Sequence, residues 1–165
     1  MLGDIQEVNI PASDMEELRT RILNMPAHPD VAHGLSLLND AGFRLVTLTN
    51  SPPHPKGSPL EHAGMAHVFE RQFSIDAIRQ FKPAPTDYQV VASALDTPLS
   101  SLCMVAAHVW DAIGAQTVAY SGALITRSEN AALLVGGVPQ PNYIAPDLVE
   151  IAKQLIGFKD RAEAR

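Results

Sequence analysis

Two hydrophobic patterns alternate along this chain. Apolar residues three and four positions apart predict amphipathic helices, and short unbroken apolar runs predict buried strands. The predicted elements, in chain order, are helices at 13–24 and 30–42, a strand at 43–48, a short helix at 58–64, a helix at 88–95, a strand at 102–107, a helix at 109–116, a strand at 117–120 and a closing helix at 146–155. Strands that alternate with helices favour βαβ units, so the predicted fold class is α/β, a three-layer Rossmann-like parallel sheet.

Helix start signals support several of these boundaries. Ser13 with Glu16, and Ser58 with Glu61, have the spacing of capping boxes, in which a side chain and a backbone N–H satisfy each other at a helix start. Asp30 is a suitable N-cap for the second helix, and Gly42 is a suitable terminator for it.

Polar residues gather where strands end or shortly afterwards. Thr49 and Asn50 follow the first predicted strand, Lys82 lies in the Pro-rich loop before the 88–95 helix, and His108 and Asp111 follow the 102–107 strand. The carboxyl ends of parallel strands form the usual ligand edge of an α/β sheet. A hydroxyl and an amide there can hold an anionic or leaving group, a lysine can neutralise a carboxylate, and an aspartate can orient that lysine.

Composition limits the possible partners. With 165 residues, 46% of them apolar, the chain is long enough for one ordinary domain. A net charge of -6 without a Lys/Arg cluster argues against nucleic acid as a partner, and no apolar stretch predicts a membrane span. The single cysteine, Cys103, excludes an internal disulfide and favours a reducing, cytoplasmic location, with core packing as its expected role.

Three segments of the chain resemble the motifs of the haloacid dehalogenase superfamily, in its L-2-haloacid dehalogenase-like branch. Residues 45–51, Leu-Val-Thr-Leu-Thr-Asn-Ser, resemble its second motif. Phe-Lys-Pro-Ala-Pro at 81–85, followed by Tyr88, resembles its third, and Met-Val-Ala-Ala-His-Val-Trp-Asp-Ala-Ile-Gly-Ala at 104–115 resembles its fourth. The resemblance covers roughly residues 25–156.

The resemblance implies a hydrolase that cleaves carbon–halogen bonds of small 2-haloacids through an aspartyl ester. By motif match, Lys82 would pair with the attacking aspartate, while Asp111 and His108 would position Lys82 and water. Thr49 and Asn50 would bind the substrate and leaving group, and Trp110 would form the pocket wall. No cofactor or metal is expected, because the Mg²⁺-dependent phosphatases of the superfamily gather a second acid where this chain has Ala106, Ala107 and His108.

One part of the family pattern is not found in this chain. The attacking aspartate of the family ends a first strand, which a helical cap separates from the second motif, whereas only a helix pair precedes Thr49 here. We therefore predict residues 1–27 as an N-terminal segment with a remnant of the last cap helix, and 28–165 as the core domain. The first strand is central in that sheet, so we expect residues 5–10, or a second copy in a strand-exchanged homodimer, to fill its place.

The motif residues also have simpler interpretations. Asp111 can cap its helix as well as face the site, Asn50 can serve as a turn residue, and Trp110 can lie in the core. His108 can be structural and Lys82 a solvated loop residue. Three functions stay open at this point: a dehalogenase-like hydrolase that is truncated or divergent and inactive alone, a non-catalytic binding or assembly protein, and a Mg²⁺-dependent phosphatase.

Overall fold

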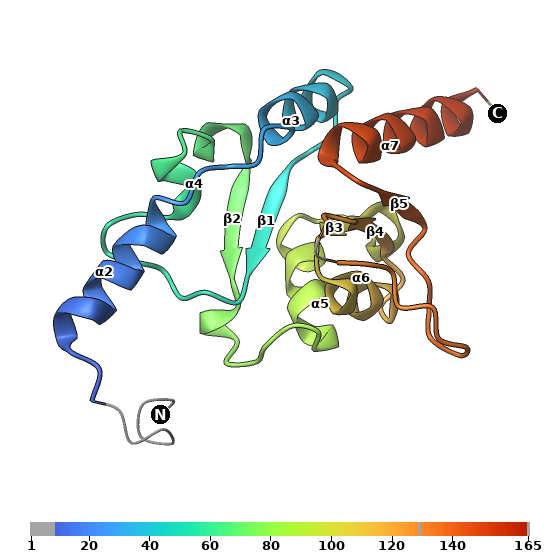
Figure 1. The fold of residues 1–165 in the computed structure, drawn as a ribbon. Helices are drawn as coiled ribbons and strands as arrows, with labels where there is room; N and C mark the ends of the chain where they lie inside the picture. Colours follow the sequence, from blue (N-terminus) through green and yellow to red (C-terminus); the bar gives the residue numbers. More distant parts are fainter. Residues whose placement is uncertain (1–8, 129, 165) are drawn as a thin grey trace.

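The structure, a computed structural model, describes residues 9–128 and 130–164 (Figure 1). Its elements in chain order are α2 (Ala12–Leu23), α3 (Val31–Asp40), β1 (Val46–Thr49), α4 (Pro59–His62), β2 (Arg71–Ser74), α5 (Pro85–Ala94), β3 (Cys103–Ala106), α6 (Val109–Gln116), β4 (Ser121–Ile125), β5 (Tyr143–Ala145) and α7 (Leu148–Glu163). Short 3-10 turns occupy Ala66–Val68, Ile75–Ala77 and Leu99–Ser101. None of the described helices is long and apolar enough to span a membrane.

The strands form two separate parallel sheets. β1 pairs with β2, and β3, β4 and β5 pair in that order, so the predicted parallel α/β fold is confirmed (Figure 1). Within residues 9–128 and 130–164 no strand lies between β1 and β3, and these two strands do not pair with each other. Of the segment proposed to fill that place, residues 5–8 lie outside the described residues, and Asn9 and Ile10 form no strand.

Two apolar clusters hold the sheets side by side. In the first, α3 and α7 pack on β4 through Leu38 and Ile151, and this cluster also contacts Leu45 and Val105. In the second, Tyr88 and Ala92 of α5, Ala115 of α6, and Val118 and Tyr120 pack together, and Leu48 of β1 and Met104 of β3 contact this cluster. Each cluster therefore touches both sheets, and β1 and β3 contribute to both.

Several predicted elements differ from the observed ones. The strand predicted at 117–120 is wrong: the backbone N–H of Tyr120 closes the end of α6 on the Ala115 carbonyl, with Ala119 left-handed at φ 70°, and β4 begins only at Ser121. β2 and β5 were not predicted, because Arg71–Ser74 contains one apolar residue and Tyr143–Ala145 is only three residues long.

Of the three predicted helix caps, one is confirmed and two are wrong. The Ser58 and Glu61 box is confirmed, since each side chain accepts the other's backbone N–H. The Ser13 and Glu16 box is wrong, because α2 starts after Pro11 and the Ser13 hydroxyl donates to Asp14 instead. Asp30 does precede α3, but its carboxylate makes no cap there and binds distant residues.

Candidate functional site

Three loops meet at the Lys82 side chain. Its ammonium donates to the Leu48 carbonyl at the end of β1 at 3.0 Å, and lies 3.2 and 3.3 Å from the two carboxylate oxygens of Asp111 in α6. The backbone N–H of Lys82 donates to Asn50 Oδ1 at 3.0 Å. The structure thus brings together Asn50, Lys82 and Asp111, which are 32 and 29 residues apart in the chain.

The Lys82 and Asp111 side chains form a buried ion pair, with exposed fractions of 9% and 6%. Burial of an ion pair is tolerated when further hydrogen bonds satisfy the charges, as the Leu48 carbonyl does here. A lysine ammonium has three N–H donors, and Leu48 and Asp111 use two of them. No other side chain or carbonyl within residues 9–128 and 130–164 accepts the third donor, which can therefore bind a further acceptor such as a carboxylate.

Close packing of α6 sets the position of the lysine loop. Gly114 of α6 faces Pro83 and Tyr88, and a Cβ at Gly114 would come within 2.7 Å of the Tyr88 hydroxyl oxygen. That hydroxyl donates to the Asp111 carbonyl at 3.3 Å. The absence of a side chain at Gly114 therefore allows the helix that carries Asp111 to approach the loop that carries Lys82.

His108 and Trp110 lie at the open side of the cluster. His108 is the N-cap residue of α6, and its Nδ1 is 4.0 Å from Asp111 Oδ2. Its ring stacks on Trp110, with centroids 4.5 Å apart, and Trp110 is 50% exposed. Trp110 is thus not a core residue. The interpretation of Asp111 as a helix cap is wrong, because His108 is the N-cap residue of α6 and no side chain makes a cap hydrogen bond there. The Asp111 carboxylate does face Lys82.

The β1 turn uses its polar groups internally. The Thr49 hydroxyl accepts the backbone N–H of Ser51 at 3.1 Å, and the Ser74 hydroxyl donates to the Ser51 carbonyl. The side-chain oxygen of Asn50 accepts the backbone N–H of Lys82, so Asn50 links the turn after β1 to the loop that carries Lys82.

Asp87 is a buried acid that the sequence analysis missed. It is fully buried in the first turn of α5, and neither carboxylate oxygen has a hydrogen-bond partner among the described residues. Burial raises the pKa of Asp87, and the charge of Lys82 opposes that rise. In sequence, an acid in a helix's first turn is typical of a solvated group favoured by the helix dipole, so nothing local indicated burial.

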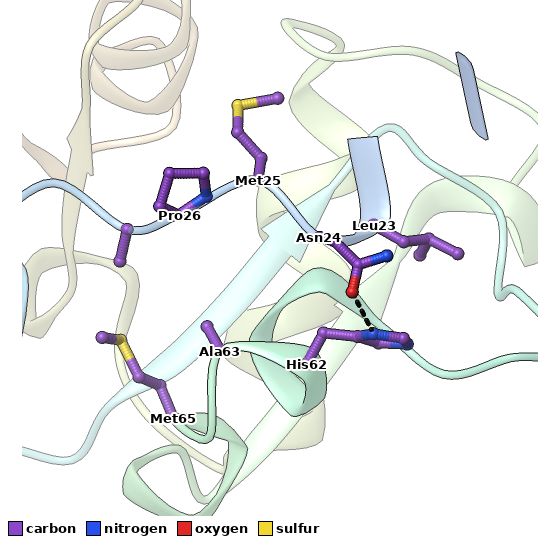
Figure 2. Close-up of a pocket in the computed structure, with 8 residues that line it drawn as sticks. Leu23, Asn24, Met25, Pro26, His62, Ala63 and Met65 are labelled. Carbon is purple, nitrogen blue, oxygen red and sulfur yellow. Dashed lines mark hydrogen bonds between the residues drawn. The ribbon is translucent and has the colours of Figure 1, made fainter. Parts of the chain in front are cut away.

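A cavity of about 260 Å³ lies elsewhere, between the end of α2 and α4 (Figure 2). Its lining is mostly apolar, with one polar pair in which His62 Nδ1 is 3.1 Å from Asn24 Oδ1. None of the predicted site residues lines it. Among the residues that the structure describes, no three His, Cys, Asp or Glu side chains are grouped closely enough to hold a metal ion.

The match to a known family comes from residues 4–118, which fit the model of the haloacid dehalogenase-like hydrolases. The chain belongs to this family. It is 28% identical over 133 residues to (S)-2-haloacid dehalogenase 2 of Pseudomonas sp. strain CBS-3, covering 81% of this chain and 57% of that relative. It is 30% identical over 132 residues to (S)-2-haloacid dehalogenase of Xanthobacter autotrophicus, covering 78% and 50%. The predicted superfamily and branch are confirmed, and the chain spans about half of these relatives' length.

Solved structures confirm the family's fold. The L-2-haloacid dehalogenase from Xanthobacter autotrophicus superposes with a TM-score of 0.79 at 22% identity, covering 94% of this chain and 71% of that one. A HAD phosphatase from Thermococcus onnurineus superposes with a TM-score of 0.73, also at 22% identity, covering 93% and 68%. Because dehalogenases and a phosphatase match alike at this identity, the superpositions establish the fold and do not distinguish between the two reactions.

Proposed function

We propose that the Lys82 cluster, which consists of Leu48, Asn50, Lys82 and Asp111, is part of a 2-haloacid dehalogenase-type hydrolytic site. We also propose that this chain releases no halide by itself. The observation that carries the proposal is the buried Lys82 ammonium, which contacts Leu48 and Asp111 and has a third N–H donor that no described residue accepts. The relatives named as (S)-2-haloacid dehalogenases support a small 2-haloacid as substrate.

In the proposed reaction, a carboxylate oxygen attacks C2 of the haloacid, the carbon–halogen bond breaks and the halide leaves with the bonding electrons. Water then attacks the ester carbonyl, which restores the carboxylate and releases the 2-hydroxy acid and one proton. The free donor of Lys82 would orient the attacking carboxylate, and Asp111 with His108 would hold Lys82 and water. Thr49 and Asn50 would contact the substrate and leaving group, and Trp110 would wall the pocket.

The attacking carboxylate is the missing part of this scheme. In the described part of the chain, Asp111 is the one carboxylate in contact with Lys82, and it serves as that lysine's partner. Asp87 is fully buried, so no substrate reaches it. We propose that residues 28–165 supply the core domain and 1–27 a cap remnant, and that the carboxylate comes from outside this cluster.

Haloacid binding and halide release test the proposal separately. We expect 2-chloropropionate to shift the backbone resonances of Asn50, Lys82 and Asp111 saturably, with no chloride release above background. The Lys82→Met variant should lose these shifts, whereas Lys153→Met, a change at an exposed lysine on α7, should keep them. Absence of any shift in the folded wild-type chain would contradict the proposal.

A non-catalytic binding protein is the second candidate, because Asp111 is already committed to Lys82. Haloacid binding that never leads to chloride release, even with acetate added in excess to supply an attacking carboxylate, would establish this reading. Binding of phosphate with Mg²⁺, and phosphatase activity that EDTA abolishes, would instead support the phosphatase alternative.

A further inference from the structure

Helix α2 is attached to the rest of the molecule by few contacts. Leu23 is its one buried residue, and the other side chains of Ala12–Leu23 are exposed. Where α2 ends, the cavity of about 260 Å³ lies between it and α4, so apolar packing at this junction is incomplete (Figure 2). Polar contacts therefore supply much of the attachment, namely the Lys56 and Glu16 ion pair at 2.5 Å and the contacts of His62.

The His62 ring bridges α2 and the turn before α4. Its Nδ1 lies 3.1 Å from Oδ1 of Asn24, the residue that ends α2, and its Nε2 lies 2.8 Å from the carbonyl oxygen of Lys56. Figure 2 shows the Asn24 contact beside the other residues that line the cavity. One imidazole ring thus contacts one oxygen atom on each of the two segments.

Both of these oxygen atoms can only accept hydrogen bonds. Asn24 Nδ2 donates to the Thr20 carbonyl at 2.8 Å, and this bond fixes the amide, because a flipped amide would place two oxygen atoms against each other. Oδ1 of Asn24 therefore faces His62. A neutral imidazole has a single N–H and can donate to one of the two oxygens, whereas a doubly protonated ring donates to both. The observed contacts are thus all satisfied only when His62 is charged.

Four ionisable groups lie beside this bridge. The Lys56 ammonium is paired with Glu16, and the Glu61 carboxylate belongs to the capping box of α4. His54 Nδ1 accepts the backbone N–H of Lys56 at 3.1 Å, so that nitrogen carries no proton. The turn at Lys56 therefore needs a neutral His54 and a charged His62, and these conditions are met together only at intermediate pH.

We propose that His62 is a pH-dependent latch for α2. The charged ring ties Asn24 to the Lys56 carbonyl and holds α2 against α4. Loss of one ring proton leaves a nitrogen lone pair facing an oxygen atom, and α2 is released. Histidine changes its charge between about pH 5 and pH 8, so the release falls in the physiological range. It also widens the cavity, because residues of both segments line it.

This latch is separate from the Lys82 cluster and does not depend on the proposed function. None of the residues of that cluster lines the cavity. Haloacid binding and the position of α2 can therefore be measured independently.

Nitrogen NMR spectra of the histidine rings, recorded on the full chain, test the charge of His62. Its signals are identified by their loss in the His62→Phe variant. We expect both ring nitrogens to carry protons at about pH 6 and only one of them at about pH 8.5. A ring that carries a single proton at the lower pH would overturn the proposal.

Pulsed electron spin resonance tests the position of α2. Nitroxides are attached at Ser13→Cys on α2 and Lys153→Cys on α7, both exposed positions, in a Cys103→Ser background. At about pH 6 we expect a narrow distribution of distances between the two labels. Between about pH 6 and about pH 8.5 the ratio of docked to released molecules should fall about fivefold, because a hydrogen bond from a charged donor is lost.

Three variants assign this response to the latch. His62→Phe keeps a ring without N–H donors, and Asn24→Leu removes the acceptor while His62 still titrates; in both, the ratio should not fall as the pH rises. His67→Phe changes an exposed histidine of the Ala66–Val68 turn and should respond as the wild type does. A wild-type ratio that is equal at both pH values, or an unchanged pH response in His62→Phe or Asn24→Leu, would overturn the proposal.

Discussion

The Asp30 carboxylate accepts two hydrogen bonds from the Arg127 guanidinium, at 2.8 and 3.0 Å, across 97 residues of sequence. The same carboxylate accepts the backbone N–H of Leu148 at 2.7 Å. One side chain thus joins the start of α3, the loop after β4 and the start of α7. The Arg127 hydrogen bonds lower the pKa of Asp30 from its ordinary 3.8 to about 2.

This link predicts an acid-sensitive contribution to stability. Because the folded pKa lies below the unfolded one, the contribution is present above about pH 4 and is lost as the pH falls toward 2. The difference corresponds to about 2 kcal/mol. Asp30→Asn should lower the free energy of unfolding by about that amount at neutral pH, with a smaller effect in acid. Urea unfolding across the pH range measures this, with Asp160→Asn, an exposed change on α7, as control; equal effects of the two variants would contradict it.

Asp87 predicts the opposite pH dependence. Burial raises its pKa, so the folded state favours the neutral acid, and stability is lost as the pH rises through the folded pKa. Asp87→Asn should therefore be more stable than wild type by about 1 kcal/mol at mildly alkaline pH, and nearly equal to it in acid. Thermal unfolding at both extremes checks the sign. A variant that is less stable at alkaline pH would show that the carboxylate has a partner that stabilises it.

The buried Lys82 and Asp111 pair should behave as a unit. Lys82→Met leaves Asp111 buried without its partner and should cost about 3 kcal/mol or more of unfolding free energy. The double variant Lys82→Met with Asp111→Leu removes both charges and should recover much of that loss. A double-mutant cycle measures the coupling, and additive effects would contradict the pairing.

Cys103 should be slow to react. Burial raises the pKa of its thiol to about 12, so the reactive thiolate is scarce at neutral pH, and its side chain packs against the core. A thiol-reactive disulfide reagent should modify the native protein far more slowly than the urea-unfolded protein. Equal rates would mean that β3 is open to solvent, contrary to its packing.

Local sequence patterns predicted the elements whose ends are marked by capping or turn residues. Pro59 and the Ser58 capping box predict the start of α4. Gly42, which is left-handed at φ 77°, ends the turn after α3 as predicted. The 109–116 helix was placed correctly because its apolar spacing and the preceding strand agree. The motif order also indicated which loops hold Asn50, Lys82 and Asp111, since parallel strands bring their carboxyl ends together.

By itself, the sequence determined the alternation of helices and strands, the family and the identities of the polar residues at the strand ends, because these follow from contacts within a few residues and from motif spacing. Only the tertiary structure decided that Asp87 is buried, that Asp30 binds Arg127, and that β1 and β3 lie in two separate sheets. Those outcomes depend on which distant backbone and side-chain groups meet, and a hydrogen bond across 97 residues leaves no trace in local periodicity.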